Sequence, residues 1–211
     1  MRFDVITIFP EIFDSFLKES LLAKAIDKKI IKINIHNLRN FAYGKHQIVD
    51  DKPYGGGPGM VLKIEPIHKA IKKIKKKDSK VIFLSPRGKK FNQSLARKWA
   101  KNLKQLIIIS GRYEGLDERV KKMADETISV GDFITLGGEI PAMAIIEAVA
   151  RLKPRVVGRV ESIEKLDFPQ YTRPEIFSPK KDVNWTVPKV LVSGNHKKIE
   201  EWRKKQAKEI K

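Results

Sequence analysis

Residues 106–115 read LIIISGRYEG, an apolar run that stops abruptly at a polar segment holding two glycines. Four consecutive aliphatic residues are typical of a strand that is buried on both faces of a parallel sheet. Two other stretches repeat this design, VIFLSPRG at 81–88 and TISVGDFITLGG at 127–138. Ligands of open α/β sheets bind beyond the carboxyl ends of the strands, where glycine lets the backbone approach closely. The three segments together predict one ligand pocket, with three ordinary turns as the simpler alternative.

Strand and helix patterns alternate around these segments, which predicts an α/β fold with a mostly parallel sheet. Further strands are expected at 5–9 and 31–35. Helices are expected after Pro10, from Pro66, after an N-cap at Asn92, at 118–124 after an N-cap at Asp117, and from Pro141 to about Leu152.

The composition restricts the class of protein. The 211 residues are 41% hydrophobic and 33% charged, which is typical of a soluble globular chain. No apolar run approaches the length of a bilayer, and the N-terminus lacks a signal-peptide pattern, so we expect a cytoplasmic protein without a membrane partner. The absence of cysteine excludes disulfides and thiolate chemistry. The formal net charge of +19 favours a polyanionic partner such as a nucleic acid, over a merely lysine-rich surface.

Known catalytic and nucleotide-binding motifs are missing from the sequence. It contains no G-x-G-x-x-G after a strand, no P-loop, no H-E-x-x-H and no nucleophile elbow. The four histidines are scattered, so no metal site is predicted from them. Residues 49–60, by contrast, read VDDKPYGGGPGM, where prolines and glycines shape the chain around two acids and a tyrosine. We interpret this stretch as a substrate loop rather than a spacer, with Asp50, Pro58 and Gly59 as candidate substrate-binding residues.

The composition changes after residue 158. We expect an α/β domain at 1–158, a linker at 159–172 and a small helical tail at 173–211, whose last helix covers about 197–208. Ser193 or Asn195 is a candidate N-cap for that helix. Its lysines and Arg203 could contact phosphates or simply be solvated.

Six segments in this order complete a pattern: VDDKPYGGGPGM, FLSPRG, SGRYEGLDERV, VGDFITLGGEIPAM, PQYTRPE and LVSGNH. The pattern, which extends from about residue 3 to about 206, strongly resembles the bacterial tRNA (guanine-N1)-methyltransferase family. The resemblance implies a knotted α/β (SPOUT-type) fold with a trefoil knot, and an obligate homodimer with the active site between subunits. It also implies S-adenosylmethionine as methyl donor and methylation of the tRNA guanosine just 3′ of the anticodon. It leaves open whether a divalent cation is required.

The resemblance also assigns residues by position. Arg151 matches the family's catalytic arginine, although the residue could merely satisfy carbonyls at a helix end. Ser162 matches a serine that holds the guanine. The residues that match the family's donor site are Leu84, Ser85, Pro86, Gly111, Tyr113, Glu114, Val130, Gly131, Asp132, Phe133, Ile134, Thr135, Gly137, Gly138 and Pro141.

The sequence departs from the family pattern in the linker. About seven residues are missing after Ser162, and the aspartate that serves the family as general base is among them. Asp167 is our candidate for that role, with Glu164 and Glu161 as alternatives. Thr135-Leu136 replaces the more usual Leu-Ser, and the tail is shorter than in the family. Two other functions therefore stay open, a weakened relative that binds tRNA or donor without efficient turnover, and a knotted methyltransferase that acts on ribosomal RNA.

Overall fold

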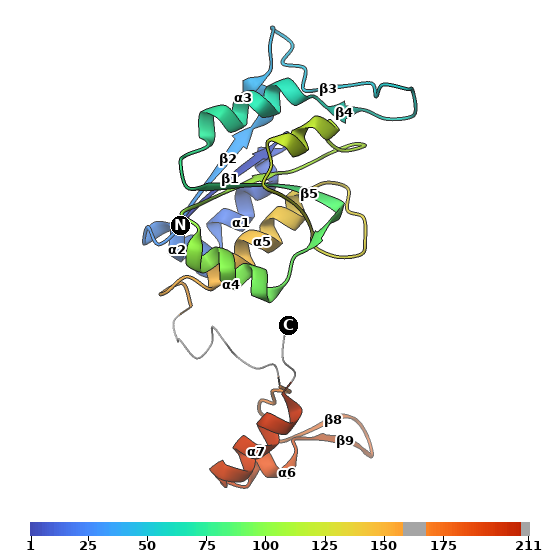
Figure 1. Cartoon of the computed structure of the whole chain (residues 1–211). Helices are drawn as coiled ribbons and strands as arrows, with labels where there is room; N and C mark the ends of the chain where they lie inside the picture. The colour runs from blue at the N-terminus through green and yellow to red at the C-terminus, as the bar shows by residue number, and fades with distance from the viewer. Residues whose placement is uncertain (158–167, 208–211) are drawn as a thin grey trace. The chain divides into compact units, whose positions relative to one another are not determined.

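The structure is a computed structural model that describes residues 1–157 and 168–207. The chain divides into two compact units, Met1–Ile163 and Glu164–Lys211 (Figure 1). Ser162, Asp167, Glu161 and Glu164 lie outside the described residues.

A five-stranded sheet forms the centre of the first unit, in the order β2-β1-β6-β5-β7. All neighbouring strands are parallel, as in the pairing of Val5 with Ile108. The prediction of an α/β fold with a mostly parallel sheet is confirmed. The strands are β1 (Arg2–Thr7), β2 (Lys32–Asn37), β5 (Ser79–Lys90), β6 (Gln105–Ile109) and β7 (Glu126–Ser129).

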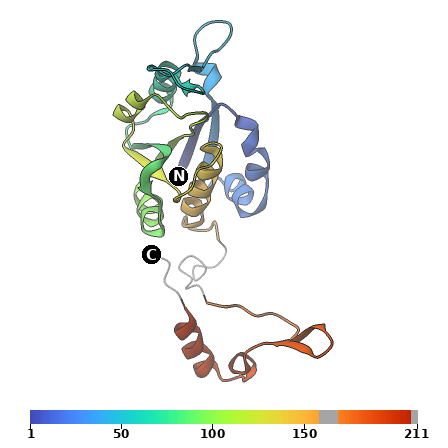
Figure 2. The same cartoon turned by 90° about the vertical axis from the view of Figure 1, so that its right-hand side faces the viewer.

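Helices cover both faces of this sheet, so the central strand β6 is buried along its whole length. Its side chains alternate, with Leu106 and Ile108 in one core and Ile107 and Ile109 in the other. Figure 2 shows α4 and α5, in green and gold, side by side on one face. That face carries η1 (Pro10–Phe13), α2 (Ser20–Asp27), α4 (Gln93–Asn102) and α5 (Glu139–Arg151), while the other carries η2 (Leu38–Phe41), α3 (Ile64–Ile74) and η3 (Glu118–Lys122).

Element boundaries differ from the expected ones where short-range signals compete. Asn92 caps α4 as predicted, because its side chain accepts a hydrogen bond from the Leu95 amide at 2.9 Å. The helix expected after Pro10 is instead broken into η1, α1 (Asp14–Lys18) and α2, and Ser20, the first residue of α2, has φ 63°. Asp117 caps the segment that follows it, as predicted, but that segment is the 3-10 helix η3, which ends at Lys122 rather than at residue 124.

Strand β5 makes an excursion that the sequence did not predict. Leu84 and Lys89 both pair with Ile128 of β7, so residues 85–88 leave the ladder between them. The backbone at Gly88 comes close to the backbone of β7, because an added Cβ atom at Gly88 would lie 2.5 Å from the carbonyl carbon of Ile128. The segment SPRG therefore wraps around the end of β7 rather than forming a simple turn.

The second unit is small. The sequence predicted a helical tail, but the unit also contains two strands. Its described part contains a hairpin of β8 (Ile176–Lys180) and β9 (Val183–Thr186), followed by α6 (Lys189–Val192) and α7 (His196–Gln206). Asn195 caps α7 by accepting a hydrogen bond from the Lys198 amide at 3.1 Å. None of the helices in the described parts of either unit has the length and hydrophobicity to cross a bilayer.

Candidate functional site

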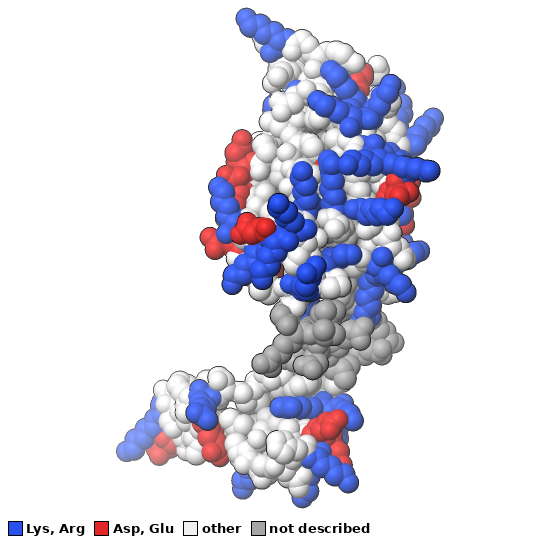
Figure 3. All heavy atoms as spheres, turned by 90° about the vertical axis from the view of Figure 1, so that its left-hand side faces the viewer, with Lys and Arg blue, Asp and Glu red and all other residues white. Residues whose placement is uncertain are grey.

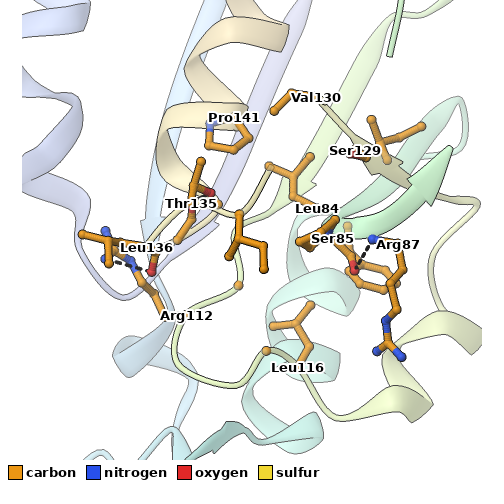
Figure 4. A pocket seen from close by; sticks show the side chains of 18 of the residues that line it. Leu84, Ser85, Arg87, Arg112, Leu116, Ser129, Val130, Thr135, Leu136 and Pro141 are labelled. Atoms are coloured by element: carbon orange, nitrogen blue, oxygen red, sulfur yellow. Dashed lines mark hydrogen bonds between the residues drawn. The ribbon is translucent and has the colours of Figure 1, made fainter. Parts of the chain in front are cut away.

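One pocket lies beyond the carboxyl ends of β5, β6 and β7, where the three glycine-bearing segments meet (Figure 4). Its volume is about 390 Å³, within the range of small-molecule sites. All the expected donor-binding residues line it except Gly131 and Asp132. Its lining also includes residues that were not among the expected donor-binding residues, such as Arg87, Arg112, Leu116, Glu118, Ser129 and Leu136.

Direct backbone contact holds two of the segments together. The Gly138 amide donates to the Gly111 carbonyl at 2.9 Å, and Arg112 pairs with Gly137 in an isolated bridge. An added Cβ atom at Gly138 would lie 2.7 Å from Cα of Ser110, closer than two carbon atoms can pack. Glycine is therefore needed at position 138 because the two backbones touch there.

A buried ion pair fixes the same corner of the pocket. Arg112 Nε donates to Glu139 Oε2 at 2.8 Å, and Thr7 Oγ1 donates to Glu139 Oε1 at 2.7 Å. Glu139 is fully buried at the start of α5, where a negative charge interacts favourably with the helix dipole. Arg112 also donates to the Leu136 carbonyl at 3.4 Å and lies 4.7 Å from the ring centre of Phe9. This network connects β1, β6 and α5 with the loop that closes the pocket.

The pocket combines apolar walls with backbone polar groups. Leu84, Leu116, Val130 and Pro141 come from four separate stretches of chain and surround the space in Figure 4. Hydroxyl groups hold the loops by local bonds, such as the 2.7 Å bond from Thr135 Oγ1 to the Gly137 carbonyl. Apolar walls beside backbone segments suit a heteroaromatic ring with polar edges.

Several polar and charged groups stand at the edges of the pocket. In the view of Figure 4, Arg87 and Arg112 lie on opposite sides. Glu114 and Glu118 add two carboxylates to the lining. Asp132, which does not line the pocket, is an exposed side chain paired with Lys90. A ligand with both a cationic and an anionic group would find complementary charges here.

The C-terminal end of the predicted substrate loop, at Gly59 and Met60, reaches the pocket-lining residue Glu114. Asp50 lies in the short strand β3 (Asp50–Asp51), which pairs with β4 (Val61–Leu62), so this stretch is less irregular than expected. The Glu114 amide donates to the Met60 carbonyl at 3.0 Å. Gly59 is at φ +79°, and an added Cβ there would lie 2.6 Å from Glu114 Oε1. The loop therefore ends against a pocket-lining residue, while Pro58 is exposed.

Arg151 does not line the pocket of its own chain. It is the last residue of α5, ten residues beyond the pocket residue Pro141. At a rise of 1.5 Å per residue, the two backbone positions are separated by about 15 Å. The side chain is exposed at that end of the helix. Within one chain, the candidate catalytic arginine and the pocket are thus apart.

A second cluster of titratable groups lies at the opposite end of β1. Asp4 is fully buried, and its carboxylate accepts hydrogen bonds from Arg2, Asn34 and Gln105 and contacts His36 Nε2 at 2.8 Å. Burial opposes ionisation of Asp4, but these hydrogen bonds outweigh it and hold its pKa well below the ordinary value. In the described part of the chain, no group of three His, Asp or Glu side chains is placed to hold a metal ion.

Comparison with known proteins identifies the family of the chain that forms this pocket. The family described as "tRNA (Guanine-1)-methyltransferase TrmD" matches residues 1–210. The chain belongs to this family of enzymes. The resemblance drawn from the six segments is thereby confirmed, as is the expectation that the chain is an enzyme.

Individual relatives match at high identity along almost the whole chain. Three of them, all named tRNA (guanine-N(1)-)-methyltransferase, come from Dictyoglomus turgidum, Carboxydothermus hydrogenoformans and Dehalococcoides mccartyi. The first is 50% identical over 214 residues, covering 98% of this chain and 85% of the relative. The second is 52% identical over 215 residues, covering 98% and 83%. The third is 48% identical over 218 residues, covering 98% and 86%.

Proposed function

We propose that the protein is a cytoplasmic enzyme that transfers a methyl group from S-adenosylmethionine to guanine N1 of tRNA, at the nucleotide just 3′ of the anticodon. The observation that carries this proposal is the family match along the whole chain, joined to a pocket built from the family's own segments. We infer the donor, the nucleotide position, the homodimer and the knot from that match and from the geometry of the pocket and of the segments around it.

The pocket suits the donor in size and chemistry. Its volume of about 390 Å³ is adequate for a nucleoside carrying an amino acid chain. Leu84, Leu116 and Pro141 offer apolar surface to an adenine, and the Gly111 and Gly137 segments offer backbone groups to its edge. Glu114 and Glu118 supply negative charge that suits an ammonium or sulfonium group. The bound donor would supply an electrophilic methyl group.

The chain's own residues would then act on the guanine. N1 carries a proton, so a general base must remove it before the nitrogen can form a bond to carbon. We assign the role of general base to Asp167, with Glu164 and Glu161 as alternatives. We assign to Ser162 the role of holding the guanine. Arg151 would stabilise the negative charge that develops on O6 as the proton leaves. Asp50, Pro58 and Gly59 would contact the substrate from the loop that ends on Glu114.

A homodimer resolves the separation of Arg151 from the pocket. If Arg151 acts about 15 Å away from Pro141 of its own chain, the pocket that it serves belongs to a second copy. A suitable apolar surface surrounds Arg112, where Phe9, Leu136 and Ile140 are 37%, 94% and 62% exposed. Large exposed apolar side chains of this kind are typical of subunit interfaces. We infer that this surface contributes to the dimer contact.

A trefoil knot is consistent with the path of the pocket segments. The excursion at 85–88 passes around Ile128 of β7, and the chain after β7 returns to touch Ser110 and Gly111 before entering α5. Three segments far apart in sequence thus cross at close range. We propose that α5 begins where the chain has passed through the loop formed by the other two segments.

Charge supports tRNA as the substrate. On the face in Figure 3, Lys and Arg side chains greatly outnumber Asp and Glu. The chain as a whole has 44 Lys and Arg against 25 Asp and Glu. Such an excess attracts a phosphate backbone and makes binding dependent on salt. We assign part of this contact to the tail after residue 172.

The test is methylation of unmodified tRNA with labelled S-adenosylmethionine, followed by mapping of the modified nucleotide. The proposal predicts N1-methylguanosine just 3′ of the anticodon. The linker lacks about seven residues around the family's base, and this favours a second candidate, a binding protein with little turnover. Donor and tRNA binding without methylguanosine, even after long incubation, would establish that candidate. Methylation of ribosomal RNA fragments in preference to tRNA would redirect the proposal to that substrate.

A further inference from the structure

The hairpin of the second unit has one aromatic face and one polar face. Phe177 of β8 lies directly opposite Trp185 of β9, and their ring centres are 5.8 Å apart. On the other face, Ser178 hydrogen-bonds to Asn184. Because side chains alternate along a strand, the two rings share a surface that the polar pair does not touch.

This aromatic pair is exposed rather than part of the unit's apolar cluster. Phe177 is 51% exposed and Trp185 is 62% exposed. Two other aromatic residues of the unit, Tyr171 and Trp202, pair with each other at 6.4 Å between ring centres. Neither Phe177 nor Trp185 is among the described residues that line the cavity beside α7. The two rings thus present a broad apolar surface to a partner.

Charge near the pair indicates what kind of partner fits. Lys180 and Lys181 occupy the hairpin tip, where Asp182 at φ 64° turns the chain. Residues 168–207 contain nine Lys and Arg against four Asp and Glu. The central part of a protein–protein contact is depleted in lysine, whereas surfaces that bind single-stranded RNA combine aromatic rings with cations. The combination therefore favours RNA over a protein.

We propose that the Phe177–Trp185 face, with Lys180 and Lys181, is a stacking platform for an unpaired nucleotide of the RNA substrate. The inference rests on the proposed function, because it names a contact made by the same substrate. A nucleobase in a stem has no free face, so the nucleotide must come from a loop, a bulge or an end. One ring stacks on the base while the lysines lie beside its phosphates. The site recognises unpaired structure rather than sequence, because every base has an aromatic face.

The test compares full-length variants for binding to unmodified tRNA across a salt series. Stacking of one base corresponds to about 1–3 kcal/mol, so Trp185→Ala should weaken binding by about 5- to 150-fold. Trp185→Phe keeps a ring and should retain most of the affinity. Ile176→Ala is the matched control, because Ile176 is 54% exposed on the other face of the same hairpin and should bind like the wild type. Joint replacement of Lys180 and Lys181 by alanine should flatten the salt dependence, whereas Trp185→Ala should leave the slope unchanged.

Fluorescence gives a readout that a purely structural role would not produce. Trp99 is buried at 2% exposure, so in a Trp202→Phe background the exposed indole is that of Trp185. A single-stranded oligonucleotide should quench it, and a fully paired RNA duplex should quench it much less.

Three outcomes would overturn the inference. Unchanged tRNA binding by Trp185→Ala would refute it directly. Equal losses of tRNA affinity for Trp185→Ala and Ile176→Ala would mean that the aromatic pair only stabilises the hairpin. A change in sedimentation without a change in RNA affinity would make the face a contact between protein chains. In each case, a wild type that still methylates tRNA leaves the proposed function standing, whereas a wild type that binds no tRNA refutes the function itself.

Discussion

Replacing Gly138 by alanine tests how the pocket is held together. The added methyl group would lie 2.7 Å from Cα of Ser110 and 2.9 Å from the Gly111 nitrogen. Carbon atoms pack at about 3.5–4.0 Å, so the two backbones must separate by about 1 Å. That movement also stretches the 2.9 Å hydrogen bond from Gly138 to Gly111. Overpacking costs about 1–3 kcal/mol and the weakened hydrogen bond about 1 kcal/mol, which gives about 2–4 kcal/mol in total.

Thermal unfolding measures the expected loss of stability, and titration calorimetry measures the expected loss of donor-site affinity. For a chain of this size, 2–4 kcal/mol lowers Tm by roughly 5–15 °C. The affinity for S-adenosylhomocysteine should fall at least about tenfold, because the loop at 133–138 moves away from the strand ends. Gly111→Ala is the matched control for stability, since its added Cβ finds no atom closer than 3.7 Å. If Gly138→Ala melts at the same temperature as Gly111→Ala and binds like the wild type, the close contact does not hold the pocket.

Four further predictions follow from the site, the buried cluster and the surface charge. Arg151→Ala should lower methylation at least about 100-fold with donor affinity unchanged; a large loss in a donor titration would instead place Arg151 in the donor site. Asp167→Asn should slow single-turnover methylation more than Glu164→Gln does, and the reverse order would make Glu164 the base. Asp4→Asn should lower the free energy of unfolding by about 3 kcal/mol at pH 7. Since the pKa of Asp4 is lower in the folded than in the unfolded chain, this difference should persist above about pH 5 and shrink as pH falls through 4. Urea unfolding at pH 7 and pH 3 measures it, and a gap that does not change would contradict the buried carboxylate. Affinity for tRNA should fall steeply with salt, and a flat response would reduce the lysines to solvated surface.

Much of the first unit could be predicted from local patterns. The aliphatic run at 106–109 has no polar face, which is why it indicates a strand buried on both sides. The glycines that follow such strands marked the pocket, because the carboxyl ends of parallel strands share one edge of the sheet. The six segments identified the family, which the comparison confirmed.

Other features depend on contacts that no local pattern encodes. Arg112 and Glu139 meet across 27 residues, and Thr7 meets Glu139 across 132. The wrap of residues 85–88 around Ile128 lies in a segment without strand periodicity. The hairpin in the tail was missed because Pro179 and two lysines interrupt its alternation of apolar and polar residues, although an exposed two-stranded ribbon tolerates proline at such a position. Arg151 matched the family by position, yet its distance from the pocket emerged only from the length of α5.

Hydrogen exchange with and without S-adenosylmethionine tests the central claim most directly. If the three strand ends form one donor site, the backbone amides of Leu84 and Ser85 and those at 111–115 and 130–138 should be protected together when the donor is added, and those of α3 and the tail should not change. Donor-dependent protection confined to a different part of the chain, or none at saturating donor, would contradict the assignment of this pocket.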